Sequence, residues 1–233
     1  GIFFLHLTLM AAFVVIPSIL VHQLSINPDQ LWWVYLSLLG GGFIAMLPAV
    51  ILSERRNIQK QVFVSAVALM TLAMFVLGSS QSGFIIVLML FIYFAAFNLL
   101  EALLPSWLSK VCPVGNRGTA MGIYSTCQFL GTFAGGILGG WALSTIGTDG
   151  VFWLLAFMLL FWCFVALTMT SPKPLQTLIL HVEKTKTNEF IKSVSNIVGV
   201  EDILLIKGED LAYIKVNKTL IDLESLQPFL NRK

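Results

Sequence analysis

The sequence predicts an α-helical membrane protein followed by a small soluble α+β domain. Of its 233 residues, 57% are hydrophobic and 11% are charged, and the mean hydropathy is +0.87. Soluble domains carry about 25% charged residues. The charges are also unevenly placed, with nine in residues 1–172 and 17 in residues 173–233. We therefore expect a transmembrane domain over residues 1–172 and a soluble domain over residues 173–233.

Six apolar stretches justify the membrane part. A helix needs about 20 mainly apolar residues to cross roughly 30 Å of hydrocarbon. The apolar runs are continuous rather than alternating, which favours helices over membrane strands. The expected spans are approximately residues 2–22, 31–52, 62–78, 84–105, 119–144 and 151–170.

The basic residues of the loops predict the orientation of these spans. Lys and Arg occur between the second and third spans, between the fourth and fifth, and after the sixth, whereas the other three loops contain none. Cytoplasmic loops carry an excess of Lys and Arg. We expect a multi-pass protein of the inner (plasma) membrane with a cytoplasmic tail. The basic loop residues are Arg55, Arg56, Lys60, Lys110, Arg117 and Lys173.

The tail predicts strands and helices in the order βαββα. Residues 177–182 are typical of a strand, and residues 188–198 are typical of a helix that Gly199 ends. Residues 203–206 and 211–216 indicate a hairpin, and residues 220–230 a second amphipathic helix. This order resembles a ferredoxin-like unit, a fold that hosts several functions. A regulatory or assembly role and plain structural stability remain open.

Other features exclude several classes of function. The net charge of +2 is too small to suggest binding to nucleic acid. Cys112, Cys127 and Cys163 are widely spaced, without a C-x-x-C pair, which favours packing roles over a metal or redox site. We therefore expect no metal, no cofactor and no enzymatic activity.

A glycine-rich run marks the fifth span. Gly131, Gly135 and Gly139 recur at intervals of four residues, which lets another helix approach closely. The run could be a packing face only. It could also act as a pivot or seal between two helical bundles that rock during transport.

The loop after the second span contains Glu54 and Arg55 within a basic turn. The turn could serve only to fix the orientation of the chain. Alternatively, Glu54 and Arg55 could pair with neighbouring helix ends and hold the cytoplasmic side closed. Asn57 suits a left-handed turn position.

Two titratable residues inside the spans are candidates for proton coupling. Glu101 is the only acidic residue within a predicted span, and a charge there costs about 2.5–3.5 kcal/mol on insertion scales. His6 lies in the first span and can titrate near neutral pH. The structural alternatives are that Glu101 pairs with Arg117 or Lys110, and that His6 only packs.

Asn98, Tyr124 and Gln128 place further polar groups in the fourth and fifth spans. Such groups should face protein or a watery cavity rather than lipid. Tyr124 and Gln128 are four residues apart and share a helix face. We expect them to line a substrate cavity, with hydrogen bonds between helices as the alternative.

Together these features resemble the C-terminal half of a major facilitator superfamily transporter, through six helices with both ends cytoplasmic. The loop resembles the signature D-R-x-G-[RK]-[RK] through Glu54, Arg55 and Asn57, and departs from it at the next two positions. The glycine-rich run resembles the antiporter signature G-x3-G-P-x2-G-G, with Gly136 in place of proline.

Residues 97–106 (FNLLEALLPS) and 117–125 (RGTAMGIYS), together with the tail, resemble the YajR-like branch of proton-driven efflux transporters. The resemblance implies twelve helices in two halves, alternating access powered by protons, and a small-molecule substrate. The expected partners are therefore membrane lipid, this substrate, protons and a missing N-terminal half of six helices. Because the sequence begins at Gly1, we expect a fragment that lacks its upstream part. A membrane-anchored sensor without transport activity is the alternative.

Overall fold

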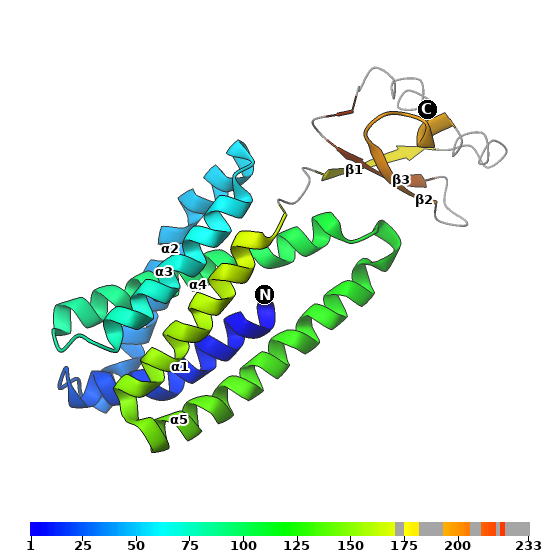
Figure 1. Cartoon of the computed structure of the whole chain (residues 1–233). Helices are drawn as coiled ribbons and strands as arrows, with labels where there is room; N and C mark the ends of the chain where they lie inside the picture. The colour runs from blue at the N-terminus through cyan, green and yellow to red at the C-terminus, as the bar shows by residue number, and fades with distance from the viewer. Residues whose placement is uncertain (171–174, 182–192, 206–210, 218–219, 222–233) are drawn as a thin grey trace. The chain divides into compact units, whose positions relative to one another are not determined.

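The computed structural model describes residues 1–170, 175–181, 193–205, 211–217 and 220–221. The chain forms two compact units, Gly1–Pro105 with Ile123–Ser171, and Ser106–Gly122 with Pro172–Lys233. The second unit therefore contains a helical connection as well as the tail. The long helices are α1 (Ile2–His22), α2 (Leu31–Arg56), α3 (Gln59–Leu77), α4 (Gly83–Val111) and α5 (Arg117–Thr168), as Figure 1 shows. Two short 3-10 helices, η1 (Pro28–Gln30) and η2 (Val114–Asn116), precede α2 and α5.

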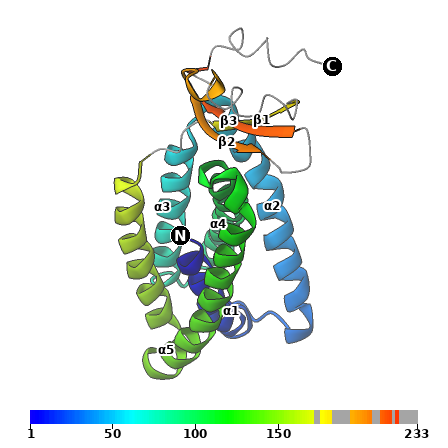
Figure 2. The ribbon, with the colours of Figure 1, turned by 90° about the vertical axis from the view of Figure 1, so that its right-hand side faces the viewer.

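In the part of the chain that the structure describes, five helices are long and apolar enough to cross a membrane. The last of them, α5, contains a break at Gly147, where φ is 71° and ψ is −177°. Glycine adopts positive φ without a steric penalty. Figure 2 shows the two arms of α5 meeting at a sharp bend. The fifth and sixth predicted spans correspond to these arms, residues 117–146 and 148–168.

The helices of the first unit differ sharply in how much of their surface they bury. Along α1, eleven residues are buried, and Leu5, Ala11 and Val15 have no exposed surface. In α2 only Leu38, Gly42 and Ser53 are buried. Within this unit α1 therefore belongs to the interior of the bundle, whereas α2 leaves most of its apolar surface uncovered.

The tail contains a three-stranded sheet formed by β1 (Leu175–His181), β2 (Val200–Leu205) and β3 (Leu211–Asn217). The strand order is β1-β3-β2, and both pairs are antiparallel. The three predicted strands are thus confirmed with small shifts of their ends. Gly199, the predicted helix stop, has a φ of 97° directly before β2.

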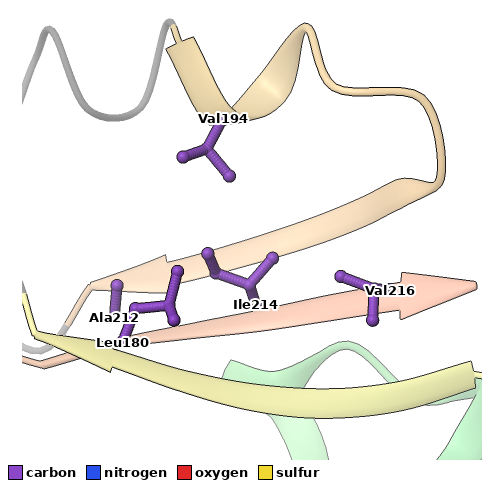
Figure 3. Close-up of a cluster of buried hydrophobic side chains, with 5 residues drawn as sticks. All are labelled: Leu180, Val194, Ala212, Ile214 and Val216. Atoms are coloured by element: carbon purple, nitrogen blue, oxygen red, sulfur yellow. The ribbon is translucent and has the colours of Figure 1, made fainter. Parts of the chain in front are cut away.

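One face of the sheet carries a small hydrophobic core. Leu180 from β1 and three residues of β3 cluster with Val194, which approaches the sheet from a short helical turn (Figure 3). Of the predicted helix over residues 188–198, the structure describes residues 193–198, which are helical at 193–195 and form a turn at 196–198. The predicted helix over 220–230 lies outside the described residues apart from 220 and 221. The ferredoxin-like fold of the tail therefore stays a prediction. The residues of β3 in this core are Ala212, Ile214 and Val216.

Lys215 of β3 joins the sheet to the end of α4 within the second unit. The side chain is 4% exposed, and its ammonium group donates hydrogen bonds to the backbone carbonyls of Ser109, at 3.5 Å, and Cys112. The last carbonyls of a helix lack partners within the helix and carry partial negative charge. Lys215 therefore satisfies the end of α4 from a strand more than a hundred residues away.

Candidate functional site

Three polar side chains from three different helices meet inside the first unit. His6 comes from α1, Glu101 from α4 and Gln128 from α5. The side-chain nitrogen of Gln128 lies 2.9 Å from His6 Nε2 and 3.4 Å from Glu101 Oε1. Glu101 Oε2 lies 3.7 Å from His6 Nε2. The two candidates for proton coupling are therefore neighbours, and Gln128 touches both.

The glycines of α5 explain why Gln128 reaches His6. Gly131, Gly135 and Gly139 are buried against the backbone of α1. A Cβ atom on Gly139 would lie only 2.7 Å from the Cα of Ala11, and one on Gly135 would overlap the carbonyl of Leu7. Because Gln128 precedes Gly131 by three residues, it lies near the same helix face. The close approach of the two backbones thus brings its amide within reach of the ring.

His6 is held on its other sides as well. Its Nδ1 atom lies 3.3 Å from the backbone carbonyl of Ile2, one turn earlier in α1. The ring of Phe97 meets the imidazole edge-on with centroids 5.7 Å apart. Phe97 is one turn before Glu101 on α4, so the same helix supplies both the apolar wall and the carboxyl group. His6 is only 8% exposed.

Two buried oxygens near this cluster lack hydrogen-bond partners among the described residues. They are Glu101 Oε2 and the hydroxyl of Tyr124, which lies one turn before Gln128 on α5. Buried polar atoms are normally satisfied by protein or water. An unsatisfied carboxyl oxygen beside an imidazole can accept a proton, so the cluster is chemically suited to proton binding.

Asn98 lies on α4 but belongs to a different contact. Its side-chain amide donates a hydrogen bond of 3.2 Å to the backbone carbonyl of Leu39 in α2. The Cβ that Gly42 lacks would lie 3.1 Å from the same amide nitrogen. This geometry favours the alternative of a hydrogen bond between helices for Asn98, whereas Tyr124 and Gln128 are close to the titratable pair.

Glu54 and Arg55 lie at the C-terminal end of α2, both exposed. Asn57 follows with φ of 53° and ψ of 34°, so the left-handed turn predicted there is confirmed. The backbone N–H groups of Asn57 and Ile58 both donate to the carbonyl of Ser53 and close the helix. The latch role of Glu54 and Arg55 stays a prediction.

Sequence reasoning missed two features of these sites. For Gln128 the sequence predicts a substrate cavity, with a hydrogen bond between helices as the alternative, but not its contact with both His6 and Glu101. Its separation of three residues from Gly131 is a usable signal. Lys215 was not singled out, and its place in the otherwise apolar stretch Ile214-Lys215-Val216 was the available signal. Among the described residues, no cluster of three or more His, Cys, Asp or Glu could hold a metal ion.

Comparisons with known proteins agree with the arrangement of apolar helices. Residues 1–208 match the model of the protein family described as Major Facilitator Superfamily. The chain is 38% identical over 220 residues to the inner membrane transport protein YajR of Escherichia coli. This alignment covers 93% of the chain and 48% of the relative. It is 32% identical over 139 residues to an uncharacterized transporter of Buchnera aphidicola. That alignment covers 58% of the chain and 35% of the relative. The chain thus spans about half the length, or less, of these curated relatives.

Proposed function

The chain belongs to the major facilitator superfamily and is a multi-pass membrane protein, and we propose that it forms the C-terminal half of a secondary transporter. In this proposal the complete protein exports small molecules by alternating access and takes up protons in exchange. It acts in the inner membrane, with the tail in the cytoplasm as an accessory or regulatory domain.

The cluster of His6, Glu101 and Gln128 carries this proposal. A carboxyl group within a membrane span is expensive and is therefore a functional candidate. Glu101 lies with one oxygen unsatisfied and the other 3.4 Å from an amide donor, so it has a partner in its ionised form and room for a proton. The imidazole of His6, 3.7 Å away, provides a second group that can bind a proton. We assign proton coupling to Glu101 and His6.

The uncovered faces of α2 and α5 support a second helical half as partner. Gly136 and Gly140 of α5 have nothing within 4 Å of the position of a Cβ atom, in contrast to the three glycines that touch α1. Small residues on an open face allow another helix to approach closely. Because Gly131, Gly135 and Gly139, the residues expected to act as the pivot, pack against α1, we propose that the opposite face with Gly136 and Gly140 contacts the N-terminal half instead, with lipid covering the rest. Large exposed side chains on these helices include Phe43, Ile44, Leu47, Phe129, Phe133 and Trp141.

An apolar groove between α1 and α5 supports small amphipathic molecules as substrates. Its open volume is about 430 Å³, and its lining is almost entirely apolar. Pockets of about 300–1,000 Å³ hold drug-sized ligands. The lining residues are Leu7, Phe133, Ala134, Ile137, Leu138 and Trp141.

The second candidate function is a membrane-anchored sensor, in which the helices only hold the tail. The compact core of the sheet favours it, because Leu180, Val194 and Ile214 form a separate small hydrophobic cluster. The two functions differ in whether the helices move a substrate without the tail.

The replacement Glu101→Gln tests the proposed proton coupling. The complete protein is reconstituted into proteoliposomes, and flux of a panel of amphipathic probes, beginning with ethidium, is measured with and without a pH gradient. We expect the wild type to respond to the gradient and Glu101→Gln to lose that response, because a neutral amide cannot gain and release a proton. The control Asp29→Asn removes an exposed carboxyl group from η1 and should leave flux unchanged. Unaltered gradient-driven flux in Glu101→Gln at every pH would refute the assignment.

A further inference from the structure

Gln128 has one side-chain atom that faces two titratable groups at once. Its Nε2 atom lies 2.9 Å from His6 Nε2 and 3.4 Å from Glu101 Oε1. An amide nitrogen carries two hydrogens and accepts no hydrogen bond. With the amide in this orientation, both hydrogens are used, one toward each neighbour.

This orientation fixes the proton on the ring of His6. Because Gln128 donates to His6 Nε2, that ring nitrogen must accept and carries no proton. In a neutral imidazole the other nitrogen then carries it. The Nδ1 atom lies 3.3 Å from the carbonyl of Ile2, which can accept the bond. The geometry therefore matches an ionised Glu101 and a neutral His6 protonated at Nδ1.

The opposite orientation matches the opposite protonation state. If the amide rotates by half a turn, its oxygen faces both neighbours and can only accept. Glu101 must then donate through a protonated carboxyl group, and His6 must donate through a proton on Nε2. A single amide thus cannot satisfy both partners unless their protonation states agree.

We propose that Gln128 is a positioning residue that links the proton on Glu101 to the tautomer of His6 by rotation of its side-chain amide. The inference rests on the proposed proton site. It adds that the protonation states of Glu101 and His6 change together with the orientation of the Gln128 amide. It gives the cluster two self-consistent arrangements, which is what a coupling step between helices requires.

The tautomer of His6 is measured directly by NMR of ring ¹⁵N nuclei in the complete protein in lipid nanodiscs. His6→Phe assigns the signal, and His22 and His181 serve as internal references. The neighbouring titratable groups on α5 are Tyr124 and Cys127. Tyr124→Phe and Cys127→Ser are measured alongside, so that a change common to all samples is assigned to Glu101 and His6.

For neutral His6 beside ionised Glu101, we expect the wild type to carry its proton on Nδ1. Gln128→Leu removes the donor and should abolish the dominance of the Nδ1 form. A wild-type ring protonated at Nε2, or an Nδ1 form that Gln128→Leu leaves unchanged, would overturn the inference.

The same set of proteins separates this inference from the proposed function. If Glu101→Gln retains gradient-driven flux, the proton site itself is wrong. If Glu101→Gln loses that flux while wild-type His6 carries its proton on Nε2, the proton site stands and only the role of Gln128 is wrong. The tautomer measurement needs no transported probe, so the two results are independent.

Discussion

Among single residues, Trp153 provides a hydrogen bond between distant helices of the first unit. Its indole N–H donates to the backbone carbonyl of Gly78, directly after α3, at 3.0 Å. The ring also packs edge-on against Phe75, with centroids 5.4 Å apart. The hydrogen bond to Gly78 and the ring contact with Phe75 therefore come from one side chain. A substitution that keeps the aromatic ring but lacks the N–H group removes only the hydrogen bond.

We expect Trp153→Phe to lower the free energy of unfolding by about 0.5–1.5 kcal/mol, the net value of a typical hydrogen bond. Phenylalanine keeps an aromatic ring beside Phe75 but leaves the carbonyl of Gly78 without its donor. Thermal unfolding of the purified protein in detergent measures the loss. Trp141→Phe is the matched control, because the Trp141 side chain is 58% exposed. Equal destabilisation by both replacements would contradict a specific role for the bond.

A second residue-scale prediction concerns Lys215 and the thiol of Cys112 in the second unit. Lys215 donates to the carbonyl of Cys112, and the Cys112 side chain is buried. We expect Lys215→Met to speed maleimide labelling of Cys112 about tenfold, because a charge-assisted hydrogen bond contributes about 1.5–3 kcal/mol. The measurement uses a background in which Cys127 and Cys163 are serine.

Lys60→Met serves as the control for this experiment, since it removes a positive charge from the other unit. Its labelling rate should match that of the parent protein. If Lys215→Met also labels at the parent rate, the bonds from Lys215 do not keep Cys112 covered, and the prediction is wrong.

For single residues, the sequence identifies the unusual polar side chains within the spans. It does not predict which of these side chains are in contact. His6 and Glu101 are conspicuous because polar groups are rare within apolar spans. Their contact with Gln128 depends on how α1, α4 and α5 are rotated about their axes, which packing determines. Asn98 shows the same limit, because its partner is a backbone carbonyl of Leu39 that no sequence pattern marks.

At the scale of elements, α5 carries two sets of glycines with opposite surroundings. Gly135 faces the carbonyl of Leu7, where a Cβ atom would overlap, whereas the neighbouring Gly136 has open space. Adding a methyl group to a tightly packed contact forces backbone shifts that cost about 1–3 kcal/mol. Alanine in an open helical position is instead favoured over glycine by up to about 1 kcal/mol.

We therefore expect Gly135→Ala to destabilise the first unit by about 1–3 kcal/mol and Gly136→Ala to be neutral or slightly stabilising. Thermal unfolding of the two single variants measures this difference. The separation of α1 from α5 in Gly135→Ala should also weaken the contact between Gln128 and His6, which the ring ¹⁵N spectrum reports. Identical melting temperatures for the two variants would show that the backbones are not in the close contact described.

The membrane helices follow from the sequence because apolar length alone marks them. The exact break between the last two spans does not, because the sequence predicts a loop over residues 145–150, whereas in the structure only Gly147 departs from helical dihedral angles. The strands of the tail follow from their apolar patterns. The pairing of β1 with β3 connects residues distant in sequence, and the order of elements along the chain does not specify it.

At the scale of the whole molecule, the proposed transporter includes a second helical half in addition to this chain. The chain spans 48% of the length of the YajR relative, and only Leu38, Gly42 and Ser53 are buried along α2. In the proposed transporter the substrate cavity lies between two halves and takes residues from both, so this chain supplies candidate proton-binding groups but only part of the proposed substrate site. The location of the tail on the cytoplasmic side of the membrane is inferred from the charges of the loops and stays a prediction.

Deletion of residues 173–233 from the complete protein separates a transporter from an anchored sensor. If the helices perform transport, the truncated protein should keep measurable gradient-driven flux, because His6, Glu101 and Gln128 all lie outside the deleted segment. The rate should fall, since the deletion also removes Lys215 from the carbonyls at the end of α4. Lys215→Met in the full-length protein is the matched control and should reproduce that part of the effect. Complete loss of flux from a truncated protein that still unfolds cooperatively would contradict the transporter proposal and favour the sensor, whose function requires the tail.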